Sequence, residues 1–271
     1  MRIAVIGSGT SARTLPPHLA TLADDDASVE IVHPRLVAFP ATPYERLIVD
    51  VGYVDAAEQA QRAGYDAVVI NSFADYGIEA ARAAGITMVG AGEAALRAAV
   101  ALGPRFTIVT VWPASMGHLY IERLRALGLE RQCVAVRHVG REAELAELGS
   151  DDNVMTRMQR HDARTFDRIL TVCLEAIAND GIQSLVLGCT CMAPIASQLA
   201  AALDFPVIEG SALAVLRAKR LGVAAVNRRS VVAAPTGIGA MVENSNKRGA
   251  EDDSAPMAPP EAAGACDLCI P

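Results

Sequence analysis

The sequence predicts an α/β fold built from parallel β-sheets with helices on both faces. Short apolar runs alternate with helical patterns from residue 2 to about residue 227, and this alternation is typical of parallel sheets covered by helices. The runs at 66–71 and 184–187 also end alike, in small polar residues that precede a helix. This match favours two pseudo-symmetric lobes, each a parallel four-stranded sheet flanked by helices, with the active site in the cleft between them.

Eight apolar runs account for the expected strands. They lie at 2–6, 28–33, 66–71, 87–89, 105–111, 132–139, 184–187 and 206–208. Helical patterns lie between them, for instance at 45–63, 93–102 and 114–127. The clearest helix covers 163–179, where one apolar stripe consists of Phe166, Ile169, Leu170, Cys173 and Ile177. Cys173 belongs to this stripe, so we interpret it as a core residue.

The predicted domain boundaries follow from this order. The first lobe comprises residues 1–95 together with 207–228, and the second comprises residues 96–206. Residues 229–271 hold five of the 14 prolines and show no sustained periodicity, which indicates a disordered tail. Cys266 and Cys269 in this tail have the spacing of half a zinc site, but no second cysteine or histidine pair accompanies them. We expect a thiol pair without function there, and no metal site.

Composition excludes several classes of partner. A net charge of −7 disfavours nucleic acid and anionic membranes. No apolar run approaches the ~18 residues that span a bilayer, and the apolar start of the chain is too short for a secretory signal. Six irregularly spaced cysteines do not indicate a disulfide framework, which favours a reducing, cytoplasmic compartment. Only Lys219 and Lys247 are lysines, which disfavours a cofactor held as a Schiff base.

The stretch 184–194 carries the strongest chemical signal. Its apolar run at 184–187 predicts a buried strand that is followed by a turn at Gly188-Cys189-Thr190, and a helix is expected from Met192 to about residue 203, with Pro194 in its first turn. Cys189 would then lie between a strand's carboxyl end and a helix's amino end, where ligands bind and where a thiol's pKa is lowered. We therefore predict a catalytic role for Cys189. Cys191 is interpreted as a supporting or packing residue, because Cys-x-Cys alone supplies too few metal ligands.

Two other motifs are weaker. Gly7-Ser8-Gly9-Thr10-Ser11-Ala12 follows a strand like a dinucleotide fingerprint, but Pro16 and Pro17 delay the following helix, and no acidic residue ends the second strand. A substrate-contacting loop with free N–H groups is the better interpretation. Ser72, Asp75 and His118 could suggest a hydrolase triad, but Ser72 lacks the Gly-x-Ser-x-Gly turn, and His118 is expected to be a polar surface residue.

Several segments together resemble the aspartate/glutamate/hydantoin racemase superfamily, in particular its hydantoin and allantoin racemases. They are Leu187-Gly188-Cys189-x-x-Met192, the segment Asn71-Ser72-Phe73-Ala74-Asp75-Tyr76-Gly77, the loop Gly7-Ser8-Gly9-Thr10-Ser11, and the strand Arg105-Phe106-Thr107-Ile108-Val109-Thr110. The resemblance covers residue 1 to about residue 228 and leaves out the tail.

The resemblance implies a two-lobed, cofactor-independent racemase with a small-molecule substrate, and a homo-oligomer. In such enzymes two cysteines face each other across the cleft. One thiolate removes a proton from a carbon beside a carbonyl, and the other thiol returns a proton to the opposite face. Donors at the strand ends would stabilise the enolate-like charge. The implied substrate-binding residues are Gly9, Thr10, Ser11, Phe73, Thr110 and Thr190.

Ser72 is the main departure from this pattern, because it occupies the position of the first catalytic cysteine. No cysteine occurs in residues 1–132, and a serine hydroxyl is a far weaker base than a thiolate. The first loop also differs, with Gly7-Ser8-Gly9 where Asn-Pro-Asn is usual. Three functions remain: a racemase with Cys189 opposite Ser72, a single-cysteine decarboxylase of the arylmalonate type, and a catalytically inactive ligand-binding homologue.

Overall fold

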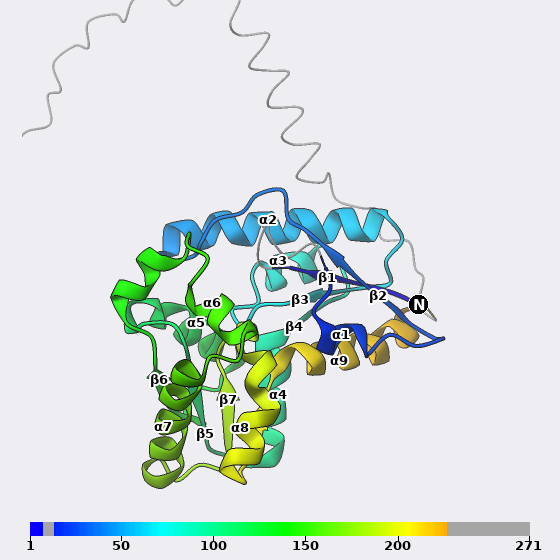
Figure 1. Ribbon diagram of the computed structural model, residues 1–271. Coiled ribbons are helices and arrows are strands. Elements are labelled where there is room, and N and C mark those ends of the chain that lie inside the picture. The colour runs from blue at the N-terminus through cyan, green and yellow to red at the C-terminus, as the bar shows by residue number, and fades with distance from the viewer. Residues whose placement is uncertain (8–13, 227–271) are drawn as a thin grey trace, which may run out of the picture. The chain divides into compact units, whose positions relative to one another are not determined.

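The computed structural model describes residues 1–7 and 14–226, and within them the strands form two parallel four-stranded sheets (Figure 1). The first sheet has the order β2-β1-β3-β4 and contains β1 (Arg2–Ile6), β2 (Ser28–Val32), β3 (Ala67–Ile70) and β4 (Met88–Gly90). The second has the order β6-β5-β7-β8 and contains β5 (Phe106–Thr110), β6 (Cys133–His138), β7 (Ser184–Leu187) and β8 (Val207–Ile208). The same strand order occurs twice, so the predicted fold of two similar lobes is confirmed.

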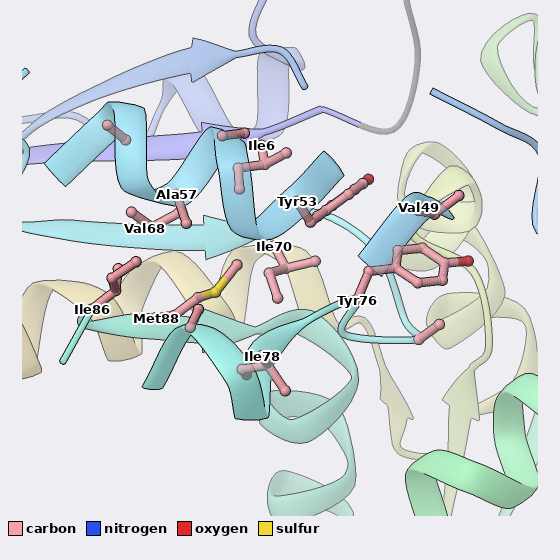
Figure 2. Packing of buried hydrophobic residues seen from close by; sticks show 14 of the residues in the cluster. Ile6, Val49, Tyr53, Ala57, Val68, Ile70, Tyr76, Ile78, Ile86 and Met88 are labelled. Atoms are coloured by element: carbon pink, nitrogen blue, oxygen red, sulfur yellow. The ribbon is translucent and has the colours of Figure 1, made fainter. Parts of the chain in front are cut away.

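Helices cover both faces of the first sheet (Figure 1). They are α1 (Pro17–Ala20), α2 (Pro43–Arg62), α3 (Ile78–Ala83), α4 (Ala91–Leu102) and α9 (Gly210–Val226). Ala4 and Ile6 face α2 and α3, whereas Ile3 and Val5 face α9, as the twofold periodicity of a strand requires. Figure 2 shows the first of these two layers, with Ile70 and Met88 packed among the side chains of α2 and α3.

A capping box fixes the start of α2. The Thr42 hydroxyl accepts a hydrogen bond from the Glu45 N–H, and the Glu45 carboxylate accepts one from the Thr42 N–H at 2.9 Å. Pro43 occupies the first turn, where a missing N–H leaves no bond unmade. The helix therefore begins two residues before its predicted start at residue 45.

The remaining helices belong to the second half of the described chain. They are η1 (Ala114–Gly117), α5 (His118–Leu127), η2 (Glu142–Glu147), α6 (Val154–Gln159), α7 (Ala163–Asn179), η3 (Thr190–Ile195) and α8 (Ala196–Leu203). The apolar stripe of α7 packs against β7 and α8, and Cys173 is fully buried in that layer. Its predicted role as a core residue is confirmed.

The boundary between the lobes falls at different places for strands and helices. β8 pairs with β7, with Val207 opposite Leu185, so it belongs to the second sheet although residues 207–228 were predicted for the first lobe. α9 packs against the first sheet, where Val215 and Ala218 are fully buried. We therefore move the proposed boundary from residue 207 to the turn before Gly210.

α4 contributes to the cores of both sheets. Ala91 and Ala94 lie in the cluster that contains β1 and α9, whereas Leu96 and Ala99 lie in the cluster that contains β5 and α5. Contacts between α5 and the first lobe add to this connection, because Arg123 pairs with Glu79 at 2.6 Å. The two sheets are thus joined by shared apolar packing and by a charged contact.

The tail predicted over 229–271, with Cys266 and Cys269, lies outside the described residues, as do Gly9, Thr10 and Ser11 of the first loop. The late helix start expected from Pro16 and Pro17 is present, because α1 begins at Pro17. Over the described ranges, every helix is too short or too polar to cross a bilayer.

Candidate functional site

Gly188 directly follows β7, in a place where no side chain fits. Its N–H donates to the Val109 carbonyl at 2.8 Å, which aligns it with β5. A Cβ at this position would lie 2.9 Å from both the Thr110 Cβ and a ring carbon of Tyr120. Only glycine permits this close approach, so the turn that carries Cys189 is held directly against β5 and α5.

The Tyr120 side chain holds this turn in place by hydrogen bonding. Its hydroxyl donates to the Gly188 carbonyl at 3.0 Å and lies 2.5 Å from the Thr110 hydroxyl, which also accepts from the Trp112 N–H. Burial raises the pKa of Tyr120, which keeps its hydroxyl protonated and able to donate. Thr110 is fully buried, and its hydroxyl is engaged within the protein. We therefore assign Thr110 to the support of the turn, whereas substrate contact was expected.

Cys189 precedes a 3₁₀ turn, whereas the predicted α-helix would have begun at Met192. The turn covers Thr190–Ile195, and α8 follows it. Pro194 has no N–H with which to continue an α-helical ladder, which accounts for the tighter turn. The Cys189 sulfur accepts the Cys191 N–H at 3.1 Å. The partial positive charge next to the Cys189 sulfur therefore comes from this one N–H group, whereas the start of an α-helix was expected to provide it.

The structure also joins Cys189 and Cys191 in a disulfide, which the sequence did not predict. Both cysteines are partly buried and pack against the core of the second lobe. A disulfide-bonded Cys189 has no thiol, so acid–base chemistry at this sulfur requires the reduced pair.

The ends of β3 and β7 meet through a hydrogen bond. The Thr190 hydroxyl donates to the Asn71 carbonyl at 3.1 Å, and these residues directly neighbour Cys189 and Ser72. The two matching strand ends therefore lie next to each other at this hydrogen bond. Ser72 and Cys189 are both partly buried at this junction.

Tyr76 is a neighbour of Ser72 that the sequence did not identify as functional. The Ser72 side chain forms a hydrogen bond with the Tyr76 hydroxyl, and burial raises the pKa of Tyr76 to about 12. The Tyr76 ring packs edge-on against Tyr53 at 5.2 Å (Figure 2). The Arg46 guanidinium lies 5.9 Å from the centroid of the Tyr76 ring. Tyr76 is thus a fixed, protonated hydroxyl beside Ser72. Tyr76 follows Ser72 by four residues in the same loop, and this spacing was the signal in the sequence that could have identified it.

Asp75 has a structural partner set, which argues against the hydrolase triad. Its carboxylate accepts the N–H groups of Gly92 and Glu93 at 2.9 and 2.7 Å, at the start of α4, and lies 3.7 Å from Arg123. Asp75 is fully buried, and this burial outweighs the donors and raises its pKa to about 7.

His118, predicted at the surface, is half-buried, and its Nδ1 lies 3.4 Å from the Ser115 carbonyl.

Phe73, predicted to bind substrate, lies in the apolar core. Its ring packs against Tyr120 at 5.5 Å, and its side chain is 5% exposed. Thr190 is partly exposed and bridges the two strand ends. Of the predicted substrate-binding residues that the structure describes, it therefore remains the candidate for direct substrate contact. Across the described residues, His, Cys, Asp and Glu form no group of three that could hold a metal ion.

Three comparisons bear on this arrangement. The family profile described as Asp/Glu/Hydantoin racemase matches residues 3–218. A hydantoin racemase of Rhizobium meliloti is 31% identical over 172 residues, which are 63% of this chain and 66% of that enzyme, just under two thirds of its length.

Among solved structures, the allantoin racemase from Klebsiella pneumoniae is similar, with a TM-score of 0.69 and 27% identity over 83% of this chain and 88% of that one. A variant of arylmalonate decarboxylase shares the fold, with a TM-score of 0.56 and 19% identity over 82% of this chain and 94% of that one.

Proposed function

Because the chain belongs to the Asp/Glu/hydantoin racemase family, we propose that it is a cofactor-independent isomerase that acts at a carbon next to a carbonyl, with reduced Cys189 as the acid–base group. The observation that carries this proposal is the hydrogen bond between Thr190 and Asn71, which joins the loops that bear Cys189 and Ser72. A substrate carbon held between these loops would be open to proton transfer from two sides.

Cys189 suits the role of base in its thiolate form. The Cys191 N–H, 3.1 Å from the Cys189 sulfur, would donate a hydrogen bond to the thiolate and so stabilise the charged form. The thiolate would take the proton beside the carbonyl and leave an enolate. The N–H groups of Thr190 and of other residues at the strand ends would stabilise its charge, together with Gly9, Thr10 and Ser11 of the first loop.

Ser72 suits the role of proton donor better than that of base. Its hydroxyl bonds the Tyr76 hydroxyl, which burial keeps protonated near neutral pH. Such a pair can deliver a proton to an enolate if Ser72 takes up the Tyr76 proton as it gives its own, which leaves the charge on the Tyr76 phenolate, whereas direct removal of a proton by Ser72 would require an alkoxide. The Ser72 side would therefore limit the rate of racemisation.

The proposed substrate is a hydantoin or a similar cyclic amide, because the hydantoin and allantoin racemases supply the similarity in sequence and in structure. The first loop has Gly7-Ser8-Gly9 where the family usually has Asn-Pro-Asn, so the exact substrate need not be that of the relatives. A homo-oligomer and independence from any cofactor remain predictions from the family, and a cytoplasmic location remains a prediction from the cysteine pattern.

Decarboxylation of an arylmalonate-type substrate is a second candidate. The observation that favours it is Ser72 itself, because loss of carbon dioxide leaves an enolate that needs only one proton donor. Cys189 alone would supply that proton.

Proton exchange in D₂O separates these functions. The reduced protein is mixed with each enantiomer of a 5-substituted hydantoin and, separately, with an arylmalonate, and the substrates are followed by NMR and polarimetry against an enzyme-free control. Deuterium uptake with loss of optical rotation supports the racemase, and release of carbon dioxide supports the lyase. Binding without either reaction would leave a ligand-binding homologue. Cys189→Ala should abolish turnover, whereas Cys133→Ser, a change of a partly buried thiol outside this site, should retain it.

A further inference from the structure

The Cys191 side chain has no part in the proposed chemistry, yet its sulfur is bonded to that of Cys189. The two Cα atoms lie 5.2 Å apart, within the range that disulfides require. Because the two cysteines are separated by one residue in the same turn, the Cys191 thiol always lies close enough to react with an oxidised Cys189. The chain therefore carries a dithiol pair at the sulfur that the proposed reaction needs free.

The other described cysteines are poorly suited to oxidation. Cys173 is fully buried, and desolvation raises its pKa to about 12. Burial likewise raises the pKa of Cys133 to about 11. Oxidants attack thiolates, so these two thiols should react slowly. Cys189 is partly exposed and receives the Cys191 N–H, so oxidation should be selective for this turn.

We propose that Cys189 and Cys191 form a reversible oxidation site for hydroperoxides. The Cys189 thiolate attacks one peroxide oxygen, the O–O bond breaks, and sulfur is oxidised to a sulfenic acid as hydroxide or alkoxide leaves. The Cys191 sulfur then attacks the sulfenic sulfur, the S–S bond forms, and hydroxide leaves and takes up the thiol's proton as water. For hydrogen peroxide the balance is two thiols and one peroxide to one disulfide and two waters. A dithiol restores both thiols by exchange.

The site has two consequences. The disulfide removes the acid–base sulfur and so stops turnover, a consequence that rests on the proposed function. Rapid capture by Cys191 also protects Cys189 from irreversible over-oxidation to a sulfinic acid. The formation of the bond itself does not depend on the substrate or on the reaction.

Differential alkylation of the full chain tests the proposal. The reduced protein is treated with hydrogen peroxide, denatured, alkylated with a light reagent, reduced, and alkylated with a heavy reagent before fragment mass spectrometry. Cys189 and Cys191 should acquire the heavy label together and in equal amounts, while Cys133 and Cys173 carry the light label. Activity, where measured, should fall in proportion to the disulfide and return with dithiothreitol.

Cys191→Ser is the matched variant. It should still lose the Cys189 thiol to peroxide, but as sulfenic and then sulfinic acid, so that the fraction recovered by dithiothreitol falls steadily with exposure time. Heavy label on Cys189 paired with Cys266 or Cys269, or full recovery of the Cys191→Ser variant, would overturn the proposal. If the disulfide forms and turnover persists, the oxidation site stands and the catalytic assignment of Cys189 fails.

Discussion

The side chains of Ser72 and Cys189 differ only in that one carries oxygen and the other sulfur. This difference determines which of the two can act as a base at the junction between β3 and β7. A thiol near its usual pKa is partly ionised at neutral pH, whereas a serine hydroxyl is not. We expect Cys189→Ala to abolish activity and Ser72→Ala to reduce it far less. Ser72→Cys should create or greatly raise racemisation of a hydantoin.

These rates are measured by polarimetry on the reduced proteins, with enzyme-free racemisation subtracted. If the wild-type protein racemises as fast as Ser72→Cys while Ser72→Ala is inactive, Ser72 is a working base and the one-thiol account is wrong.

Tyr76 is expected to act through Ser72. Tyr76→Phe removes the hydroxyl that bonds Ser72 but keeps the ring that packs against Tyr53. We expect kcat for inversion to fall by up to about 100-fold, the lower end of the scale for one positioned proton-transfer group, with little change in KM. The melting temperature should stay near the wild-type value.

Tyr53→Phe is the matched control, because Tyr53 lies in the same layer and its buried hydroxyl has no hydrogen-bond partner among the described residues. Equal losses of kcat in the two variants would assign Tyr76 a purely structural role.

At the scale of elements, Asp75 ties the loop after β3 to the start of α4. Asp75→Asn replaces one acceptor oxygen by an NH₂ group that faces a backbone N–H, either of Gly92 or of Glu93. We expect a loss of about 1–3 kcal/mol in the free energy of unfolding, as for a buried donor left without an acceptor. Urea unfolding at pH 5 measures it.

The same variant has a predicted dependence on pH. Burial raises the pKa of Asp75 to about 7 in the fold, from an ordinary value near 3.8, so between these values the folded protein binds more protons than the unfolded chain. Stability from this group is therefore fully present below about pH 4 and is lost as the pH rises through 7. The destabilisation by Asp75→Asn should be smaller at pH 8 than at pH 5.

Asp162→Asn provides the contrast. The Asp162 carboxylate caps α7 by accepting hydrogen bonds from the Thr165 hydroxyl and N–H, which lower its pKa, so its contribution should be constant between pH 5 and pH 8. An Asp75→Asn effect that grows with pH would mean that Asp75 is ionised in the folded protein.

The elements differ in how far the sequence could predict them. Strands such as β1 and β7 have the predicted bounds, because a buried parallel strand is a continuous apolar run. The 3₁₀ turn after Cys189 was missed because Pro194 is compatible with the first turn of an α-helix that starts at Met192, whereas the turn starts at Thr190 and has Pro194 inside it. Asp75 and Tyr76 lie in a loop without periodicity. Their roles come from contacts with the start of α4 and with Ser72, which exist only in the folded chain.

At the scale of the whole molecule, the core is expected to end with α9. A chain that ends at residue 228 keeps Val215 and Ala218 against β1, so its melting temperature should match that of the full chain. A chain that ends at residue 209 lacks α9 and exposes that face of the first sheet, so it should unfold or aggregate. Thermal unfolding of the three chains by circular dichroism tests this. A clear loss of stability on removal of residues 229–271 alone would show that the tail docks.

The repeated strand order has a consequence for stereochemistry. β3 and β7 hold the same place in their sheets, so the proposed site presents two equivalent loops to one carbon, with a sulfur on one and an oxygen on the other. The two enantiomers have equal free energies in solution, so inversion must have the same kcat/KM in both directions and is equally slow in each. Cys189, however, can remove and return a proton on its own face without inversion. In D₂O one enantiomer should therefore exchange its proton with retained configuration much faster than either enantiomer inverts, and Ser72→Cys should abolish this preference.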